Sequence, residues 1–189
     1  MQTMHVNMSP VADFSILNDT QCLSGNDFAF TDLSEYPGNY TRSWNFGDAS
    51  FGSDSLQSHS YTAFGNFNVK LVISTPEACS DSITKSIEVL PMPQAGFNIT
   101  DDKQCLSGNN FEFVNTSTPA DSLAFHWMFG DGDTSSAENP FHQYSVADTF
   151  EVSLIADLAG CKDTLSKTAV VFSMPLADFT VNNDSQCLG

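Results

Sequence analysis

The chain repeats itself at a fixed interval, and this repeat constrains the fold more than any other feature of the sequence. The hexapeptide Gln21–Asn26 recurs unchanged as Gln104–Asn109, and its first three residues occur a third time as Gln186–Leu188. Self-similarity at a fixed period, here about 80 residues, indicates a tandem array of similar structural units. We therefore expect two full units within the 189 residues, followed by part of a third.

Short joins that contain proline set the boundaries between the units. We place the first unit at residues 10–91 and the second at residues 92–173. Residues 174–189 then open a third unit, and residues 1–9 match the last strand of a preceding one. Proline makes a linker stiffer than a Gly/Ser sequence of the same length. We therefore expect the chain to be an excerpt of a longer array that forms a rod.

Alternation of apolar and polar residues predicts short β-strands in both units. The clearest runs are 28–30, 68–73 and 82–90 in the first unit and 111–113, 150–155 and 165–172 in the second. Clusters of Gly, Asn, Ser, Asp and Pro separate these runs, and no window has the helical period. About seven strands in about 82 residues is the size of an immunoglobulin-like sandwich. The sequence therefore predicts an all-β chain of tandem immunoglobulin-like β-sandwiches.

The charge of the chain excludes several classes of partner. Six Lys and Arg residues stand against 23 Asp and Glu residues, which gives a formal net charge of −17. Nucleic acids and anionic membrane surfaces attract basic proteins, so neither is an expected partner. Since 41% of the residues are hydrophobic and 16 are Phe, the chain can build packed cores. No apolar stretch approaches the length of a membrane-spanning helix, and we expect no membrane insertion.

Each unit contains one aromatic strand that runs into a Gly-Asp turn and is followed by a His-x-Tyr sequence. Tryptophan and phenylalanine at alternate positions face one side of a strand, and Gly-Asp provides a turn conformation. The histidine fits a structural role, pinning a corner beside a buried tyrosine, better than metal binding or base catalysis. The motif residues are Trp44, Gly47, Asp48, His59 and Tyr61 in the first unit and Trp127, Gly130, Asp131, His142 and Tyr144 in the second.

These motifs resemble the PKD domain, an immunoglobulin-like module named after polycystic kidney disease, over almost the whole of both units. The cysteine pair in each unit and the tandem order resemble the PKD arrays of large gliding and surface adhesins of Bacteroidetes-type bacteria. The resemblance implies a stiff, non-catalytic structural or adhesive segment of a secreted protein at the bacterial cell surface. The alternative is an accessory module of a secreted hydrolase that binds carbohydrate or protein, with Tyr36, Tyr40 and Phe51 as its aromatic platform.

The sequence has no motif of a known catalytic site. It contains no Gly-x-Ser-x-Gly elbow, no glycine-rich phosphate loop and no His-Glu-x-x-His spacing. We therefore expect neither an enzyme nor an obligatory cofactor.

Acidic residues just ahead of the first cysteine of each unit are candidate calcium ligands, because Ca²⁺ requires oxygen-rich loops. They are Asp19, Asp101, Asp102 and Asp184. A solvated polar turn is the competing interpretation.

Five cysteines in small polar repeats indicate an oxidising environment outside the cell. Pairing within units would join Cys22 to Cys79 and Cys105 to Cys161. If the strands of a sandwich alternate in direction, Cys22 and Cys79 lie at opposite ends, beyond the ~7 Å limit between Cα atoms in a disulfide. We therefore favour an inter-unit bond between Cys22 and Cys161, with neighbouring repeats of the same chain as partners. A strand that switches sheets would restore the pairing within units.

Overall fold

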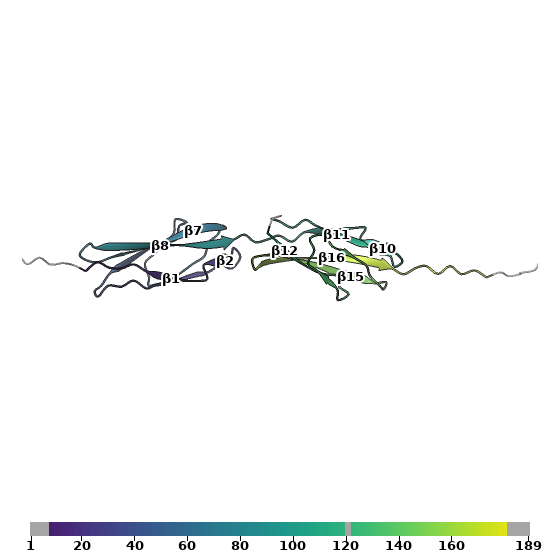
Figure 1. The fold of residues 1–189 in the computed structure, drawn as a ribbon, viewed down its shortest axis with the longest axis horizontal. Helices are drawn as coiled ribbons and strands as arrows, with labels where there is room; N and C mark the ends of the chain where they lie inside the picture. Colours follow the sequence, from purple (N-terminus) through teal and green to yellow (C-terminus); the bar gives the residue numbers. More distant parts are fainter. Residues whose placement is uncertain (1–7, 120–121, 181–189) are drawn as a thin grey trace, which may run out of the picture. The chain divides into compact units, whose positions relative to one another are not determined.

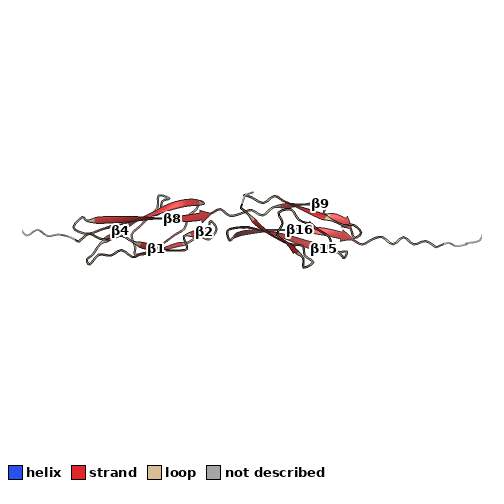
Figure 2. Ribbon diagram, viewed as in Figure 1, coloured by secondary structure: helices blue, strands red, loops and turns tan. Residues whose placement is uncertain are grey.

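The computed structural model describes residues 8–119 and 122–180, and every regular element in these ranges is a β-strand (Figure 1, Figure 2). The chain divides into two compact units, Met1–Pro93 with Leu158–Lys162, and Gln94–Asp157 with Asp163–Gly189. Each unit contains a three-stranded and a five-stranded sheet around its own core, which confirms the predicted tandem β-sandwiches. No helix in the described ranges is long and apolar enough to cross a membrane.

Most of residues 1–9, predicted to be a strand of a preceding unit, and the end of the predicted third unit lie outside the described residues. The part of that third unit that is described, residues 174–180, contains no strand. The structure therefore adds nothing to these two expectations.

The first unit is built from β1 to β8, with strand order β1-β3-β6 in the smaller sheet and β2-β8-β7-β4-β5 in the larger one. Neighbouring strands are antiparallel, except that β2 runs parallel to β8. The bounds are β1 Phe14–Leu17, β2 Thr20–Cys22, β3 Phe28–Asp32, β4 Thr41–Asn45, β5 Phe51–Gly52, β6 Leu56–His59, β7 Gly65–Ser74 and β8 Ser80–Leu90.

The second unit repeats this topology with β9 to β16. Its sheets have the orders β14-β11-β9 and β10-β16-β15-β12-β13, and β10 runs parallel to β16. The bounds are β9 Phe97–Thr100, β10 Lys103–Cys105, β11 Phe111–Asn115, β12 Ala124–Met128, β13 Thr134–Ser135, β14 Phe141–His142, β15 Thr149–Leu158 and β16 Cys161–Phe172.

Alternating burial explains the two ten-residue strands, β7 and β15. In β7 the side chains of Val69, Leu71 and Ile73 are completely buried, and the residues between them face outward or lie half-buried. Because successive side chains of a strand point to opposite faces, one face supplies the core and the other remains accessible to water. The predicted run 68–73 lies inside β7, and the run 150–155 lies inside β15.

An aromatic contact joins the two sheets of each sandwich. Phe14 of β1 meets Trp44 of β4 edge to face, with ring centroids 5.1 Å apart and an interplanar angle of 76°. Phe97 and Trp127 repeat this contact with the same distance and angle. All four side chains are at most 1% exposed. Aromatic pairs prefer this geometry, which adds to the free energy gained by burying their surface.

The first cysteine of each unit lies at the end of a short strand. Cys22 ends β2 opposite Leu90 of β8, and Cys105 ends β10 opposite Phe172 of β16. The backbone amide of the next residue, Leu23, continues this pairing by donating to the carbonyl oxygen of Leu90 at 2.8 Å. A parallel edge strand forms here because it satisfies the backbone groups at the end of the last strand.

Candidate functional site

The Gly-Asp turn after β4 requires glycine at its first position. Gly47 has a φ angle of +86°, in the left-handed region that glycine favours. A Cβ atom at this position would lie 2.9 Å from the backbone oxygen of Asn68 on β7. The side-chain oxygen of Asn45 accepts a hydrogen bond from the Gly47 amide at 2.9 Å. The turn therefore approaches β7 too closely for any side chain.

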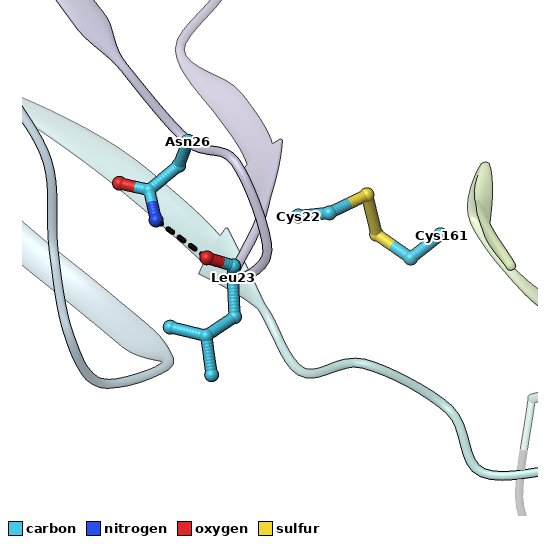
Figure 3. Close-up of a disulfide and its surroundings, with 4 residues drawn as sticks. All are labelled: Cys22, Leu23, Asn26 and Cys161. Carbon is cyan, nitrogen blue, oxygen red and sulfur yellow. Dashed lines mark hydrogen bonds between the residues drawn. A yellow bond between two sulfur atoms is a disulfide. The ribbon is translucent and has the colours of Figure 1, made fainter. Parts of the chain in front are cut away.

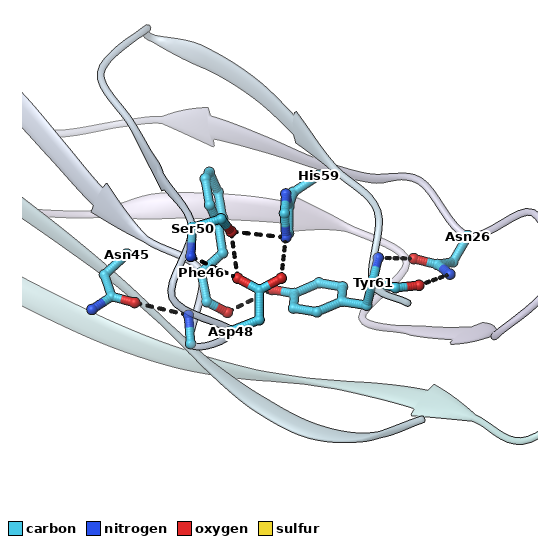
Figure 4. A network of polar contacts seen from close by, with 8 residues as sticks. Asn26, Asn45, Phe46, Asp48, Ser50, His59 and Tyr61 are labelled. Atoms are coloured by element: carbon cyan, nitrogen blue, oxygen red, sulfur yellow. Dashed lines mark hydrogen bonds and ion pairs between the residues drawn. The ribbon is translucent and has the colours of Figure 1, made fainter. Parts of the chain in front are cut away.

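Asp48 connects the two sheets of the first unit (Figure 4). It follows β4 of the larger sheet, and its Oδ2 lies 2.7 Å from Nε2 of His59, the last residue of β6 in the smaller sheet. Its other oxygen, Oδ1, accepts hydrogen bonds from the amide, at 3.1 Å, and the hydroxyl of Ser50. The Asp48 carboxylate thus holds its own turn and the end of the opposite sheet together.

The His59 ring is enclosed by aromatic side chains. It stacks on Phe46 at a centroid distance of 4.5 Å and meets Tyr61 edge to face at 4.6 Å. The Tyr61 hydroxyl donates to the backbone oxygen of Phe46 at 2.7 Å. Burial raises the pKa of Tyr61 far above its usual value, and the nearby Asp48 carboxylate adds to this effect. The tyrosine therefore stays a neutral donor that fixes the corner.

Asn26, which the sequence interpretation did not single out, fixes the backbone of Tyr61. Its side-chain oxygen accepts from the Tyr61 amide at 2.6 Å, and its Nδ2 donates to the Tyr61 carbonyl at 2.9 Å. The same Nδ2 donates to the carbonyl of Leu23 at 2.7 Å. The residue is 6% exposed, so these bonds satisfy a polar group that burial would otherwise destabilise. Its recurrence as Asn109 was the sequence feature that could have identified it.

The second unit reproduces this network closely. His142 Nε2 lies 2.7 Å from Asp131 Oδ2, and the ring stacks on Phe129 at 4.2 Å. The Tyr144 hydroxyl donates to the Phe129 carbonyl at 2.8 Å, and the Tyr144 amide donates to the side-chain oxygen of Asn109 at 2.8 Å. Gly130 has the same φ angle of +86° as its counterpart. Eight of the ten motif residues named from the sequence thus lie in two equivalent turn-and-corner networks, and the other two, Trp44 and Trp127, form the aromatic contacts between the sheets.

The Ser50, His59 and Asp48 side chains do not form a catalytic triad. Both the Ser50 hydroxyl, at 3.1 Å, and the Asp48 carboxylate, at 2.7 Å, contact the same ring nitrogen, Nε2 of His59. In a triad the carboxylate orients the histidine through Nδ1, and Nε2 is then free to accept the proton of the nucleophile. The geometry therefore fits a structural contact and not activation of the serine.

The pKa of Asp48 is set by two opposing effects. Burial would raise it, but the hydrogen bonds from Ser50 and His59 outweigh burial and hold the pKa of the carboxyl below its usual range. The pKa of Asp131 is lowered in the same way, against the effect of burial, by hydrogen bonds from His142 and the Asp133 backbone. Both networks therefore contain an ionised carboxylate at neutral pH.

Three ligand-type side chains gather at this turn in the second unit. Asp131, Asp133 and His142 each offer one ligand atom, and these atoms lie within 4.8 Å of one another. Carboxylate and imidazole donors of this kind suit divalent metal ions. The first unit has Ser50 in place of Asp133, so it offers a hydroxyl where the second unit has a carboxylate. The two units therefore differ in metal-ligating capacity at an otherwise shared turn.

The aspartates named as calcium candidates occupy polar turns. Asp101 has a positive φ angle of 51°, and the backbone carbonyls of Asp19 and Asp102 each accept a 2.8 Å hydrogen bond from the last strand of their own unit. Among the described residues, none of these three belongs to a group of three ligand-type side chains, and Asp184 lies outside the described residues. Calcium binding at these positions stays a prediction.

The candidate aromatic platform is only partly exposed. The Tyr36 hydroxyl donates to Glu77 at 3.3 Å, and the Tyr40 hydroxyl donates to Asp32 at 2.9 Å. Both tyrosines are half-buried, whereas Phe51 is 69% exposed. The hydroxyl groups of the two tyrosines therefore anchor loops of the first unit, and Phe51 is the most exposed of the three side chains.

Two lysines that the sequence interpretation did not single out also recur. Lys85 donates to the backbone oxygen of Phe14 and lies 4.9 Å from the centroid of its ring. Lys167 makes the same contacts with Phe97, at 5.2 Å from the ring centroid. Their equivalent positions in the repeat, in a chain with only six Lys and Arg residues, were the signal that could have found them.

Cys22 and Cys161 form a disulfide in this structure, with Cα atoms 5.6 Å apart and a sequence separation of 139 residues (Figure 3). Cys22 ends β2 and Cys161 begins β16, and the division into compact units counts the segment Leu158–Lys162 with the first unit. Cys79 is half-buried and Cys105 is exposed, and both are free thiols. The described cysteines therefore form neither of the pairs Cys22–Cys79 and Cys105–Cys161.

Comparison with known proteins agrees with this architecture. A family model described as PKD domain matches residues 7–90 and again residues 91–172. The PKD1 domain from Vibrio cholerae metalloprotease PrtV is 25% identical, with 43% of this chain and 98% of that chain covered and a TM-score of 0.38. The PKD1 domain of Vibrio anguillarum Epp is 24% identical, with 44% and 96% covered and a TM-score of 0.39. Extracellular domains 3–5 of Drosophila OTK are 8% identical, with 85% and 62% covered and a TM-score of 0.58.

We predict that Gly47→Ala destabilises the first unit more than Gly25→Ala does. Both glycines have positive φ angles, +86° and +74°, so both substitutions incur the backbone cost of about 1 kcal/mol. Only at Gly47 would the new Cβ also collide with a backbone oxygen, at 2.9 Å, whereas at Gly25 no atom lies within 4 Å. Urea denaturation of the two variants measures the difference, and equal losses would contradict the close approach to β7.

We also predict that Asp48→Asn makes stability less sensitive to acid. Since the pKa of Asp48 is lowered on folding, its stabilising effect is fully present above the pKa of the unfolded chain, about 3.9, and is lost as the pH falls through the folded pKa. The variant therefore starts less stable at pH 7 and loses less free energy of unfolding between pH 5 and pH 2, measured in urea at each pH. Asp54→Asn, at an exposed position, is the control, and parallel pH profiles of wild type and Asp48→Asn would count against the proposed network.

Proposed function

Because the chain belongs to the PKD domain family, we propose that it is a structural and adhesive segment of a secreted bacterial surface protein, a stalk of consecutive repeats joined by disulfides. PKD domains are typically non-catalytic modules that act in adhesion or binding, and they are usually extracellular. In this proposal the two repeats are residues 10–91 and 92–173. The stalk is part of a large gliding adhesin.

The observation that carries this proposal is the Cys22–Cys161 disulfide. Cys22 falls within the first range matched by the family model and Cys161 within the second. This supports a bond that staples consecutive repeats to each other. Disulfides persist in oxidising surroundings, which supports a location outside the cytoplasm.

Such a bond changes how the chain carries tension. A force applied to the two ends passes along the chain to Cys22, through the sulfur atoms, and along the chain again from Cys161. The residues between the two cysteines, which include β3 to β15, then lie outside the path of the force. The staple therefore suits a segment whose task is to transmit load without unfolding.

We predict that reduction greatly lengthens the chain under force. A loop closed over 139 residues holds back about 460 to 500 Å of extended polypeptide, at about 3.3 to 3.6 Å per residue. In single-molecule stretching from the two termini, the oxidised protein should show a total contour length shorter than the reduced protein by this amount.

Two variants sharpen this stretching experiment. Cys22→Ser should show the long contour length without reductant, whereas the double variant Cys79→Ser with Cys105→Ser retains the bond and should behave as the oxidised wild type. Equal contour lengths of the oxidised and reduced wild type would overturn the stapled stalk.

A second candidate function, a binding accessory module, is favoured by the exposure of Phe51. Aromatic residues are enriched at the contact surfaces between proteins. The equivalent position in the second unit is Thr134, since Phe51 pairs with Asn45 in β4 as Thr134 pairs with Met128 in β12. A site built on this strand position would therefore be confined to the first unit.

A glycan and matrix-protein array discriminates between the two functions. The stalk proposal predicts no Phe51-dependent signal for the wild-type chain. Phe141 is an aromatic residue of the second unit with a similar exposed fraction, 61% against 69% for Phe51. A signal that disappears in Phe51→Ala and persists in Phe141→Ala would favour the binding module instead.

A further inference from the structure

The second unit contains one imidazole and two carboxylates at a spacing that suits a metal ion. The ligand atoms of Asp131, Asp133 and His142 lie within 4.8 Å of one another. Nε2 of His142 is 2.7 Å from Oδ2 of Asp131. In a tetrahedral zinc site two ligand atoms are about 3.4 Å apart, because each lies about 2.0 to 2.2 Å from the ion. A small outward movement of the Asp131 carboxylate would therefore admit an ion between these two atoms.

The His142 ring is already fixed in the orientation that such a site needs. It stacks on Phe129 with an interplanar angle of 4° and meets Tyr144 edge to face at 4.6 Å. Its side chain is 10% exposed, and its Nε2 faces the carboxylate of Asp131, which is 23% exposed. A ligand that is ordered before binding reduces the entropy lost when the ion binds. The imidazole is therefore preorganised, while the carboxylate side of the group is open to solvent.

The first unit has the same turn with a different side chain at one position. Ser50 and Asp133 are equivalent, because the carbonyl of each accepts a bond from the amide of Phe46 or Phe129, at 3.2 and 3.1 Å. Each also donates its own amide, at 3.1 Å, to the aspartate two residues before it. The Ser50 hydroxyl donates in addition to the Asp48 carboxylate. A carboxylate at this position can only accept hydrogen bonds when it is ionised.

The second unit therefore lacks the donor that Ser50 supplies in the first. Among the described residues, the Asp133 carboxylate accepts no hydrogen bond, and the charged partner of Asp131 is His142. Two carboxylates at this distance disfavour each other's charged form. A bound divalent cation reverses this effect, because it is then the largest charge in the site. The exchange of Ser for Asp thus replaces a completed hydrogen-bond network by a set of acceptors that a cation would complete.

The types of donor favour a transition-metal ion. Ca²⁺ takes six to eight oxygen ligands, and Mg²⁺ is also bound through oxygen. Imidazole suits Zn²⁺ and its neighbours in the first transition series. Three protein ligands with one position left to water is an arrangement that zinc adopts in proteins. The histidine therefore distinguishes this group from the acidic turns named as calcium candidates.

We propose that the second unit binds one Zn²⁺ ion through Asp131, Asp133 and His142, with water in the remaining position, and that the first unit does not. Asp131 and Asp133 lie in the turn between β12 and β13, and His142 ends β14 of the opposite sheet. The ion therefore joins the two sheets of the second sandwich at the place where Ser50 and its hydrogen bonds do so in the first. This site is independent of the stalk proposal, since it needs no contact between the units.

The experiment uses the full chain with Cys79, Cys105 and Cys187 replaced by Ser in every variant, because thiolates also bind zinc. Equilibrium dialysis against Zn²⁺ at neutral pH, followed by metal analysis, gives the number of ions per chain. We expect one ion per chain in this starting protein. NMR signals of the His142 ring should shift on binding, and those of the His59 ring should not.

Two reciprocal substitutions test which residue makes the site. Asp133→Ser should bind no zinc, and it should fold because the first unit forms the same turn with serine at this position. Ser50→Asp should bind two ions, and the NMR signals of His59 should then shift as well. Near-ultraviolet circular dichroism checks that both variants keep their packed cores.

Four results would overturn the proposal. They are the absence of bound zinc in the starting protein, an unchanged number of ions in Asp133→Ser, equal shifts of His59 and His142 in the starting protein, and no additional ion in a folded Ser50→Asp variant. Dialysis against Ca²⁺ in place of Zn²⁺ tests the choice of metal. Calcium bound in an Asp133-dependent manner, with no zinc bound, would also contradict the assignment.

Discussion

Each sandwich depends on the contact between a phenylalanine of the smaller sheet and the tryptophan of the larger one. Phe14 and Trp44 are both completely buried, and the Trp44 indole also donates to the backbone oxygen of Asp54 at 2.9 Å. The ring therefore fixes the distance between the sheets and at the same time holds the segment that leads into β6. With the sheets at this distance, the turn after β4 comes within reach of His59, and the polar network at the corner can form.

Both units contain this aromatic contact and the polar network at the corner, and they differ in the residues nearby. In the first unit Asp32 of β3 pairs with Arg42 of β4, and burial, which alone would raise the pKa of Asp32, is outweighed by bonds from Ser34, Arg42 and Tyr40. The second unit has Asn115 and Phe125 at the positions of Asp32 and Arg42, so no such ion pair forms there. Buried ion pairs contribute little net stability compared with apolar replacements of similar size. The sandwich therefore tolerates either pair of side chains at these two positions. The residues that recur in both units are those that form the Gly-Asp turn, the His-Tyr corner and the loop after the first cysteine.

The sequence predicted those features that leave a periodic or repeated signal. The run 68–73 alternates regularly, and it lies within β7 as predicted. Strands β2 and β10 have only three residues each, which is too short to show a period, and their parallel pairing depends on the last strand of the unit. The role of Asn26 could not be predicted, because its partner Tyr61 is 35 residues away and is brought near only by the fold. The hydrogen bond from the Ala12 amide to Oδ2 of Asp81, at 2.8 Å, joins residues 69 positions apart and could not be predicted for the same reason.

The Cys22–Cys161 bond also bears on how the chain withstands proteases. Every peptide bond between the two cysteines lies inside the covalent ring that the disulfide closes. Hydrolysis of one of these bonds opens the ring but leaves both fragments attached through sulfur. Loops are the usual sites of such nicks, and most loops of both units lie inside the ring. Two cuts, or one cut and a reductant, are needed before any piece of this segment is released.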